Sequence, residues 1–143
     1  MLKRLIFLWL IVASISSCKK PEVKGNTVLE QYFESNILNR NFIVTQAGNE
    51  GDDITALYTG YVFVLGKTDF YHGPLTVTHG NLKYQGSWSS NDDYSKLTIS
   101  LPATPPEFVF LTRNWRFTSK TMPDLKLAPW GSTANITLTM SAR

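Results

Sequence analysis

The side chains able to carry catalysis or to bind a metal are few and scattered. The two histidines, His72 and His79, lie in turn-like sequence and could approach each other in a hairpin. No Gly-x-Ser-x-Gly motif presents a serine, and a nucleophile needs a positioned base. Two histidines without a cysteine or carboxylate cluster beside them make a poor metal set. We therefore predict no catalytic residue, metal site or cofactor, and a hydrolase ranks last among the functions considered.

Two acidic segments carry oxygen ligands of the kind that calcium prefers, namely Asp52-Asp53 and Asn91-Asp92-Asp93. Neither segment has the regular spacing or the distal bidentate glutamate of a calcium-binding loop. Aspartate and asparagine are also common turn residues, because their side chains hydrogen-bond to the nearby backbone. Solvated turns are the favoured interpretation of both segments.

The one cysteine, Cys18, follows a basic start, Lys3 and Arg4, and an apolar run from Leu5 to Ile15. This order is typical of a secretory signal, and the run is shorter than the roughly 20 apolar residues of a transmembrane helix. The tetrapeptide Ile15-Ser16-Ser17-Cys18 resembles the lipobox of bacterial lipoproteins, whose cysteine receives a diacylglycerol thioether and becomes the mature N-terminus. An ordinary signal peptide with a cysteine near its cleavage site is the alternative. The position of the only cysteine favours a lipoprotein signal peptide at residues 1–17 and lipidation of Cys18.

Removal of residues 1–17 leaves 126 residues, enough for one domain, and lowers the formal net charge from +3 to +1. Such a weak charge predicts no nucleic-acid partner. Residues 18–26 are the predicted lipidated N-terminus and tether, which can extend about 25–30 Å. The predicted partner is thus a membrane, held through the lipid. Lys19 is not the aspartate associated with inner-membrane retention, so we expect the outer membrane, with either periplasmic or cell-surface display.

A helix is expected to begin at Thr27, which forms a capping-box pattern with Glu30. Asn39-Arg40-Asn41 is expected to end it. The apolar residues at helical spacing are Leu29, Tyr32, Phe33 and Ile37. A single apolar face predicts a helix that packs on a β structure or plugs one end of it. A helix that binds a partner is the less favoured alternative.

The rest of the chain alternates between apolar and polar residues. Leu82, Tyr84 and Trp88 are expected to face one way, because successive side chains of a strand point to opposite faces. The strands are predicted at 42–46, 57–65, 70–77, 82–89, 96–101, 115–121, 125–128 and 136–141, with 108–111 leading into the sixth. About eight strands joined by short turns predict an all-β fold, an antiparallel up-and-down meander closed into a barrel. Residues 27–143 form this single domain, including its N-terminal helix.

Several short motifs occur in an order that resembles lipocalin-like lipoproteins of the Bacteroidetes type. They are Asp52-Asp53-Ile54-Thr55, Tyr58-Thr59-Gly60-Tyr61-Val62-Phe63, Gly86-Ser87-Trp88, Leu97-Thr98-Ile99 and Phe110-Leu111-Thr112-Arg113-Asn114-Trp115. The resemblance covers most of residues 40–143. It implies a lipocalin-like barrel on a lipid anchor, in a family largely without assigned activity. Lipocalins carry Gly-x-Trp on their first strand, whereas here it comes midway, so their ligand cavity is not transferred residue by residue.

Aromatic side chains are the remaining lead to a site. The candidate ligand-binding residues are Tyr61, Phe63, Tyr84, Trp88, Trp115, Phe117 and Trp130. All but Trp130 are expected to point inward. An eight-stranded barrel is just wide enough to be filled by its own side chains or to hold one small ligand, and large aromatic residues favour the filled case. Trp130, in a Pro-Trp-Gly turn, is expected to be exposed, either as a lid or as a platform for a sugar or apolar ligand.

Two functions therefore remain open. The first is a lipid-anchored envelope protein whose lipocalin-like barrel binds a small apolar or amphipathic ligand. The alternative is a non-catalytic surface interaction or scaffold domain with a filled barrel. Neither function identifies a protein partner or a reaction.

Overall fold

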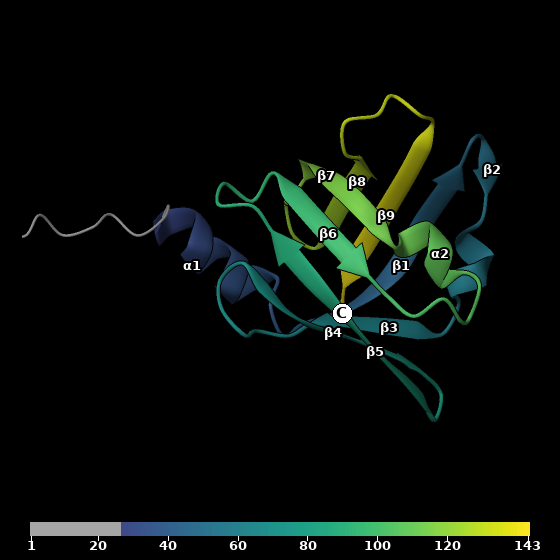
Figure 1. Cartoon of the computed structure of the whole chain (residues 1–143), viewed down its shortest axis with the longest axis horizontal. Helices are drawn as coiled ribbons and strands as arrows, with labels where there is room; N and C mark the ends of the chain where they lie inside the picture. The colour runs from purple at the N-terminus through teal and green to yellow at the C-terminus, as the bar shows by residue number, and fades with distance from the viewer. Residues whose placement is uncertain (1–26) are drawn as a thin grey trace, which may run out of the picture.

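The computed structural model describes residues 27–143 (Figure 1). The predicted signal peptide at 1–17, the lipidation of Cys18 and the tether to residue 26 lie outside this range. The helices are α1 (Thr27–Asn36), the 3-10 helix η1 (Thr55–Tyr58) and α2 (Phe108–Leu111). The strands are β1 (Asn41–Asn49), β2 (Asp52–Asp53), β3 (Tyr61–Leu65), β4 (His72–His79), β5 (Leu82–Ser90), β6 (Lys96–Ser100), β7 (Arg113–Ser119), β8 (Asp124–Pro129) and β9 (Ile136–Ala142).

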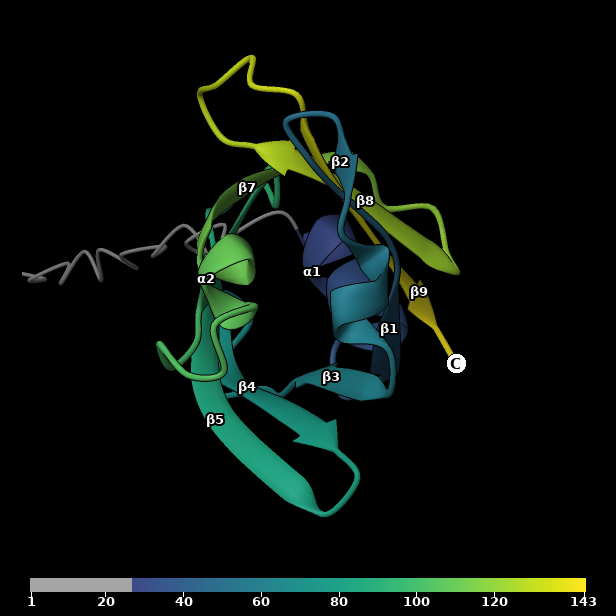
Figure 2. The same ribbon diagram turned by 90° about the vertical axis from the view of Figure 1, so that its right-hand side faces the viewer.

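The strands form one antiparallel sheet that closes on itself. Its order is β2-β1-β3-β4-β5-β6-β7-β8-β9, and β1 also pairs with β9 from Phe42↔Ala142 to Asn49↔Ile136. The short strand β2 only extends the end of β1 into a hairpin. The other eight strands form a closed up-and-down barrel, which Figure 2 shows from one end. The predicted eight-stranded antiparallel barrel with an N-terminal helix is confirmed.

Alternation of side chains places the core inside this barrel. In β3, Tyr61, Phe63 and Leu65 are buried, whereas Val62 and Val64 are half-buried on the outside. Burial of such side chains stabilises the fold by about 1.5–3 kcal/mol each. The strand periodicity read from the sequence is therefore the inside–outside pattern of the barrel wall.

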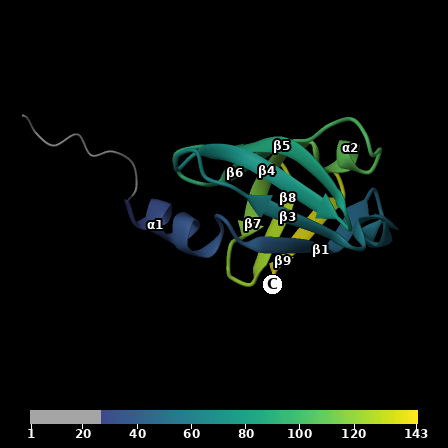
Figure 3. The ribbon, with the colours of Figure 1, turned by 90° about the horizontal axis from the view of Figure 1, so that it is seen from below.

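The helices lie at the two ends of the barrel. Figures 1 and 3 place α1 at one end and α2 at the other. Phe33 of α1 and Ile37, the residue after α1, belong to the buried core, as do Phe108 and Phe110 of α2. Of the predicted helical face, Leu29 packs at the edge of the core and Tyr32 is exposed. The helix ends at Asn36, three residues before the predicted stop.

The predicted strand at 57–65 is wrong in its first half. The Asp53 carboxylate accepts hydrogen bonds from the backbone N–H and the hydroxyl of Thr55, at 2.9 and 2.6 Å, and η1 begins there. Gly60 then has φ 82°, a left-handed conformation that favours glycine and interrupts an extended chain. The strand starts only at Tyr61. Because η1 and β3 both contribute buried residues, the apolar character of the sequence continues through the break.

Two further expectations need correction. Residues 108–111 form the helical turn α2 and are followed at once by β7, which starts at Arg113. Leu82 was expected to face inward with Trp88, but it is 57% exposed. It lies beside the turn of the β4–β5 hairpin, which extends beyond the barrel wall in Figure 1, so no opposing layer covers it.

Candidate functional site

The candidate ligand-binding residues fall into three environments. Tyr61, Phe63, Trp88 and Trp115 are buried, and Tyr84 and Phe117 are half-buried against the core. Trp130 is 41% exposed, as its turn predicted, and its ring faces the Lys96 ammonium at 5.5 Å. The structure therefore brings six of the seven residues into or against one core and leaves Trp130 outside it.

The two buried indoles are fixed by hydrogen bonds to the backbone. Trp88 Nε1 donates to the carbonyl of Gly66 at 2.6 Å, and Trp115 Nε1 donates to the carbonyl of Leu111 at 2.9 Å. Across residues 27–143, no buried side-chain nitrogen or oxygen lacks a hydrogen-bond partner. Since an unpaired buried polar group costs free energy, this arrangement suits a packed interior.

At the α1 end, aromatic rings from distant segments pack together. Phe33 of α1 stacks on Tyr94 with ring centroids 4.4 Å apart, and lies 5.5 Å from Trp88 and 6.2 Å from Phe117. The Tyr94 hydroxyl donates to the carbonyl of Phe70 at 2.7 Å. Burial raises the pKa of Tyr94, so this phenol stays neutral. These rings close one end of the barrel.

Polar contacts hold α1 in this position. The buried carboxylate of Glu30 accepts a hydrogen bond from the hydroxyl of Tyr71, and this bond raises the pKa of Tyr71 to about 12. The Tyr32 hydroxyl donates to the carbonyl of Lys120 at 2.5 Å. Glu34, farther along α1, forms an ion pair with a lysine of the β3–β4 loop. The helix is thus a docked part of the domain.

The opposite end is closed around Glu107, the residue before α2. Tyr61 donates to its carboxylate oxygen Oε1 at 2.6 Å, and Tyr58 donates to its backbone carbonyl at 2.8 Å. Burial, followed by the bond to Glu107, raises the pKa of Tyr61 to about 12. Phe108 meets Tyr61 and Tyr84 edge-on, with centroids 5.6 and 5.1 Å apart. Six aromatic candidates thus pack among themselves and against the two end caps.

The histidines do not come together. They stand at the two ends of β4, which places them more than 20 Å apart at about 3.3 Å per residue. His72 Nδ1 lies 2.8 Å from Asp69, and His79 stacks on Tyr61 at 4.3 Å. The approach in a hairpin that the sequence allowed does not occur, because both residues belong to one strand. Within the described part of the chain, no three His, Cys, Asp or Glu side chains gather as a possible metal site.

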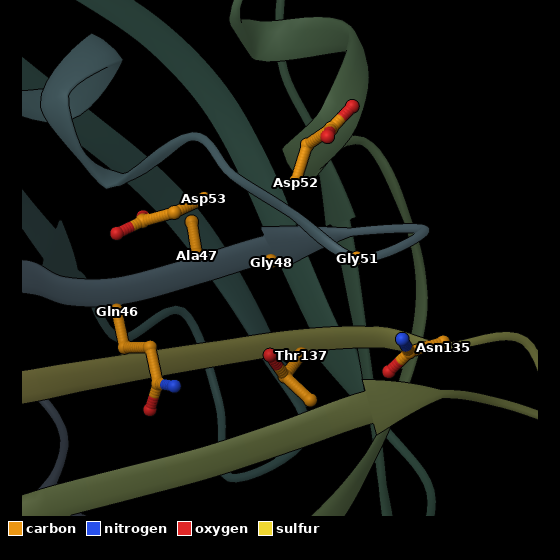
Figure 4. A pocket seen from close by; sticks show the side chains of 8 residues that line it. All are labelled: Gln46, Ala47, Gly48, Gly51, Asp52, Asp53, Asn135 and Thr137. Atoms are coloured by element: carbon orange, nitrogen blue, oxygen red, sulfur yellow. The ribbon is translucent and has the colours of Figure 1, made fainter.

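A polar groove of about 290 Å³ lies between the β1–β2 hairpin and β9. Its lining residues are Gln46, Ala47, Gly48, Gly51, Asp52, Asp53, Asn135 and Thr137. Figure 4 shows the carboxylates of Asp52 and Asp53 pointing in different directions, not toward one centre. Hydrogen bonds to Thr55 engage Asp53 and lower its pKa, as in a structural turn. The geometry agrees with the solvated-turn interpretation of this segment.

A second groove, of about 410 Å³, opens between β1 and β3. It is lined by Ile43, Val44, Tyr58, Thr59, Gly60, Tyr61, Val62 and Arg143. Tyr61 is the one predicted ligand-binding residue in this set. The groove lies between neighbouring elements of the barrel wall, and three of its lining residues, Val44, Tyr58 and Tyr61, belong to the buried core.

Sequence reasoning missed the residues that close the barrel. Glu107 follows two prolines, and Tyr94 follows Asp92-Asp93, so both lie in sequence that indicates loops. Tyr94 also has φ 53°, which is uncommon for a residue other than glycine. A tyrosine inside a polar turn was the available signal that this loop packs on the core.

No family model matches this chain, and neither curated proteins nor solved structures give a match. Among residues 27–143, none of the helices has the length and apolar character needed to cross a bilayer.

Proposed function

We propose that this chain is a lipid-anchored lipoprotein of the outer membrane, with a lipocalin-like barrel that acts as a filled, non-catalytic interaction module. The observation that carries the proposal is the closed interior, in which Phe33 and Tyr94 cover one end and Tyr61 and Glu107 join across the other. A rigid module of this kind binds other molecules through its outer surface.

The packed interior favours this function over a ligand held inside the barrel. A ligand could enter from the α1 end only by displacing Phe33, which stacks on Tyr94. It would also separate Glu30 from Tyr71 and so leave a buried carboxylate without its partner. Loss of a buried charged hydrogen bond costs about 1.5–3 kcal/mol, in addition to exposure of the ring. Binding inside therefore starts with a large penalty.

The anchor rests on Ile15-Ser16-Ser17-Cys18 and the short segment that follows. Because α1 is docked on the barrel, a lipid at Cys18 would hold the α1 end nearer the bilayer. The end with η1 and α2 would then face away from it and remain accessible. Two or more acyl chains are enough for stable membrane attachment.

The anchor is tested by expressing the full chain and its Cys18→Ser variant in a Gram-negative host. We expect the parent chain in the outer-membrane fraction, with an N-terminal peptide that begins at Cys18 and carries acyl groups by mass spectrometry. Cys18→Ser should leave the membrane. Ser17→Ala, which keeps a small residue before the cysteine, is the matched control and should stay lipidated. An unmodified residue 18, or a Cys18→Ser variant that remains membrane-bound, would refute the anchor.

A further inference from the structure

The β1–β3 groove, defined by its eight lining residues above, exists because two neighbouring strands separate. β1 and β3 pair only at Asn41↔Val64 and Phe42↔Phe63, whereas β1 continues along β9 as far as Asn49. The register of β1 against β9 shifts between Val44 and Gln46, and such a bulge bends a strand. The barrel wall therefore has a gap beside Val44, and the groove occupies it.

Gly60 lies at the rim of the groove, in the turn from η1 into β3. Its φ of 82° is unfavourable for other residues, and an added Cβ would come within 3.1 Å of the His79 ring. Glycine is therefore favoured where the chain turns from η1 into β3 beside the groove. The groove lies where β1 and β3 are no longer paired.

The groove has an apolar floor and one charged side chain. Val44, Tyr58 and Tyr61 are buried at its base, and Ile43 and Val62 are half-buried in its walls. The exposed Arg143 is the one charged residue among the eight that line it. A guanidinium pairs well with a carboxylate or phosphate, because it offers parallel N–H donors. The lining thus combines aliphatic contact with one site for an anion.

We propose that the β1–β3 groove binds a small amphipathic anion, with its acidic group at Arg143 and a short alkyl segment against Val44 and Val62. The groove has a volume of about 410 Å³. This is within the range of roughly 300–1,000 Å³ that is common for small-molecule sites, and a medium-chain carboxylate is a ligand of suitable size. This site is independent of the lipid anchor, and it leaves the packed interior of the barrel undisturbed.

Octanoate is a suitable probe, with octanol as its uncharged counterpart. Titration into the chain lacking residues 1–17, followed by amide NMR shifts, should give saturable changes at Ile43, Gly60 and Val62. Val62→Trp should fill the groove and weaken octanoate binding at least tenfold. Val64→Trp is the matched control, since Val64 is half-buried on the same side of β3 but does not line the groove, and it should bind like the parent.

A second variant tests the charge without filling space. Arg143→Gln should weaken octanoate binding about fivefold to tenfold, which corresponds to one charge-assisted contact at an exposed site, and should leave octanol binding unchanged. Equal octanoate binding by Val62→Trp and Val64→Trp would overturn the location. An equal loss of octanoate and octanol binding in Arg143→Gln would refute the contact between Arg143 and the acidic group. Absence of saturable binding would refute the groove site but would not contradict the filled barrel. NMR shifts centred on Trp88 and Trp115 would contradict both the groove site and the filled barrel.

Discussion

Phe33 of α1 and Tyr94 of the β5–β6 loop stack with their ring centroids 4.4 Å apart and their planes 27° from parallel. The pair joins the first described helix to a loop in the middle of the chain. Tyr94 adopts a left-handed backbone conformation in this arrangement, with φ 53°. Because both rings are fully buried, the stack acts as a plug at one end of the barrel.

Replacement of Phe33 by alanine should destabilise the domain strongly. Removal of a buried phenylalanine side chain typically costs about 3–5 kcal/mol, since it removes apolar contact and leaves a cavity. Urea unfolding followed by tryptophan fluorescence measures the loss. Val28→Ala, at a position on the same helix that is 74% exposed, should change the free energy of unfolding by less than about 0.5 kcal/mol. Similar small effects in both variants would mean that α1 is not docked in solution.

Alkaline titration should distinguish the tyrosines whose pKa is raised from the others. The pKa of Tyr61 and of Tyr71 is raised to about 12 in the folded chain, and that of Tyr58 and Tyr94 is raised as well. The ordinary value, expected in the unfolded chain, is about 10. Since the folded-state pKa is the higher one, the stabilising contribution of these phenols is complete below about pH 10 and is lost as the pH rises through about 12.

Phenolate absorbance and thermal unfolding across this range test the expectation. The absorbance of these tyrosines should rise late, together with unfolding. Glu30→Gln should lower the pKa of Tyr71 toward its ordinary value, because the carboxylate that raises it is gone, and should leave that of Tyr61 unchanged. Reversible ionisation of all tyrosines near pH 10 in a folded sample would contradict the buried contacts.

Gly86→Ala should weaken the barrel wall. A Cβ at this position would lie 2.2 Å from the carbonyl oxygen of Ser100 on β6, so the two strands would have to separate. Overpacking of this kind costs about 1–3 kcal/mol, and a clash with backbone favours the upper end. Ser87→Ala, at the next and exposed residue, is the control and should cost less than about 0.5 kcal/mol in the same chemical-denaturation measurement. Unchanged stability of Gly86→Ala would disprove the close approach of β5 and β6.

This close approach also explains part of the Gly-Ser-Trp motif. Because Gly86 has no side chain, β5 can pack close to β6. Trp88 is buried in the core, where its indole N–H donates a hydrogen bond to the carbonyl of Gly66. The sequence alone could predict the burial of Trp88 and Trp115, and the exposure of Trp130, because alternation and turn composition are local signals. The eight-stranded closure followed from the same alternation repeated along the chain.

The end caps could not be predicted in the same way. The hydrogen bond from Tyr61 to Glu107 joins residues 46 positions apart in the sequence, and the bond from Tyr71 to Glu30 joins residues 41 positions apart. Neither partner belongs to a pattern that indicates the contact. The interruption at 57–65 depended on the hydrogen bonds between Asp53 and Thr55, which compete with strand formation locally. Apolar periodicity does not reveal such competition.

The packed interior is tested most directly by hydrogen exchange at the tryptophan indoles. In the chain lacking residues 1–17, the indole N–H groups of Trp88 and Trp115 are buried and bonded to backbone carbonyls, whereas Trp130 is exposed. We predict slow exchange for Trp88 and Trp115, unchanged by octanoate, and fast exchange for Trp130 as the internal reference. Fast exchange at Trp88 and Trp115, or a change in their exchange on addition of octanoate, would contradict a filled barrel.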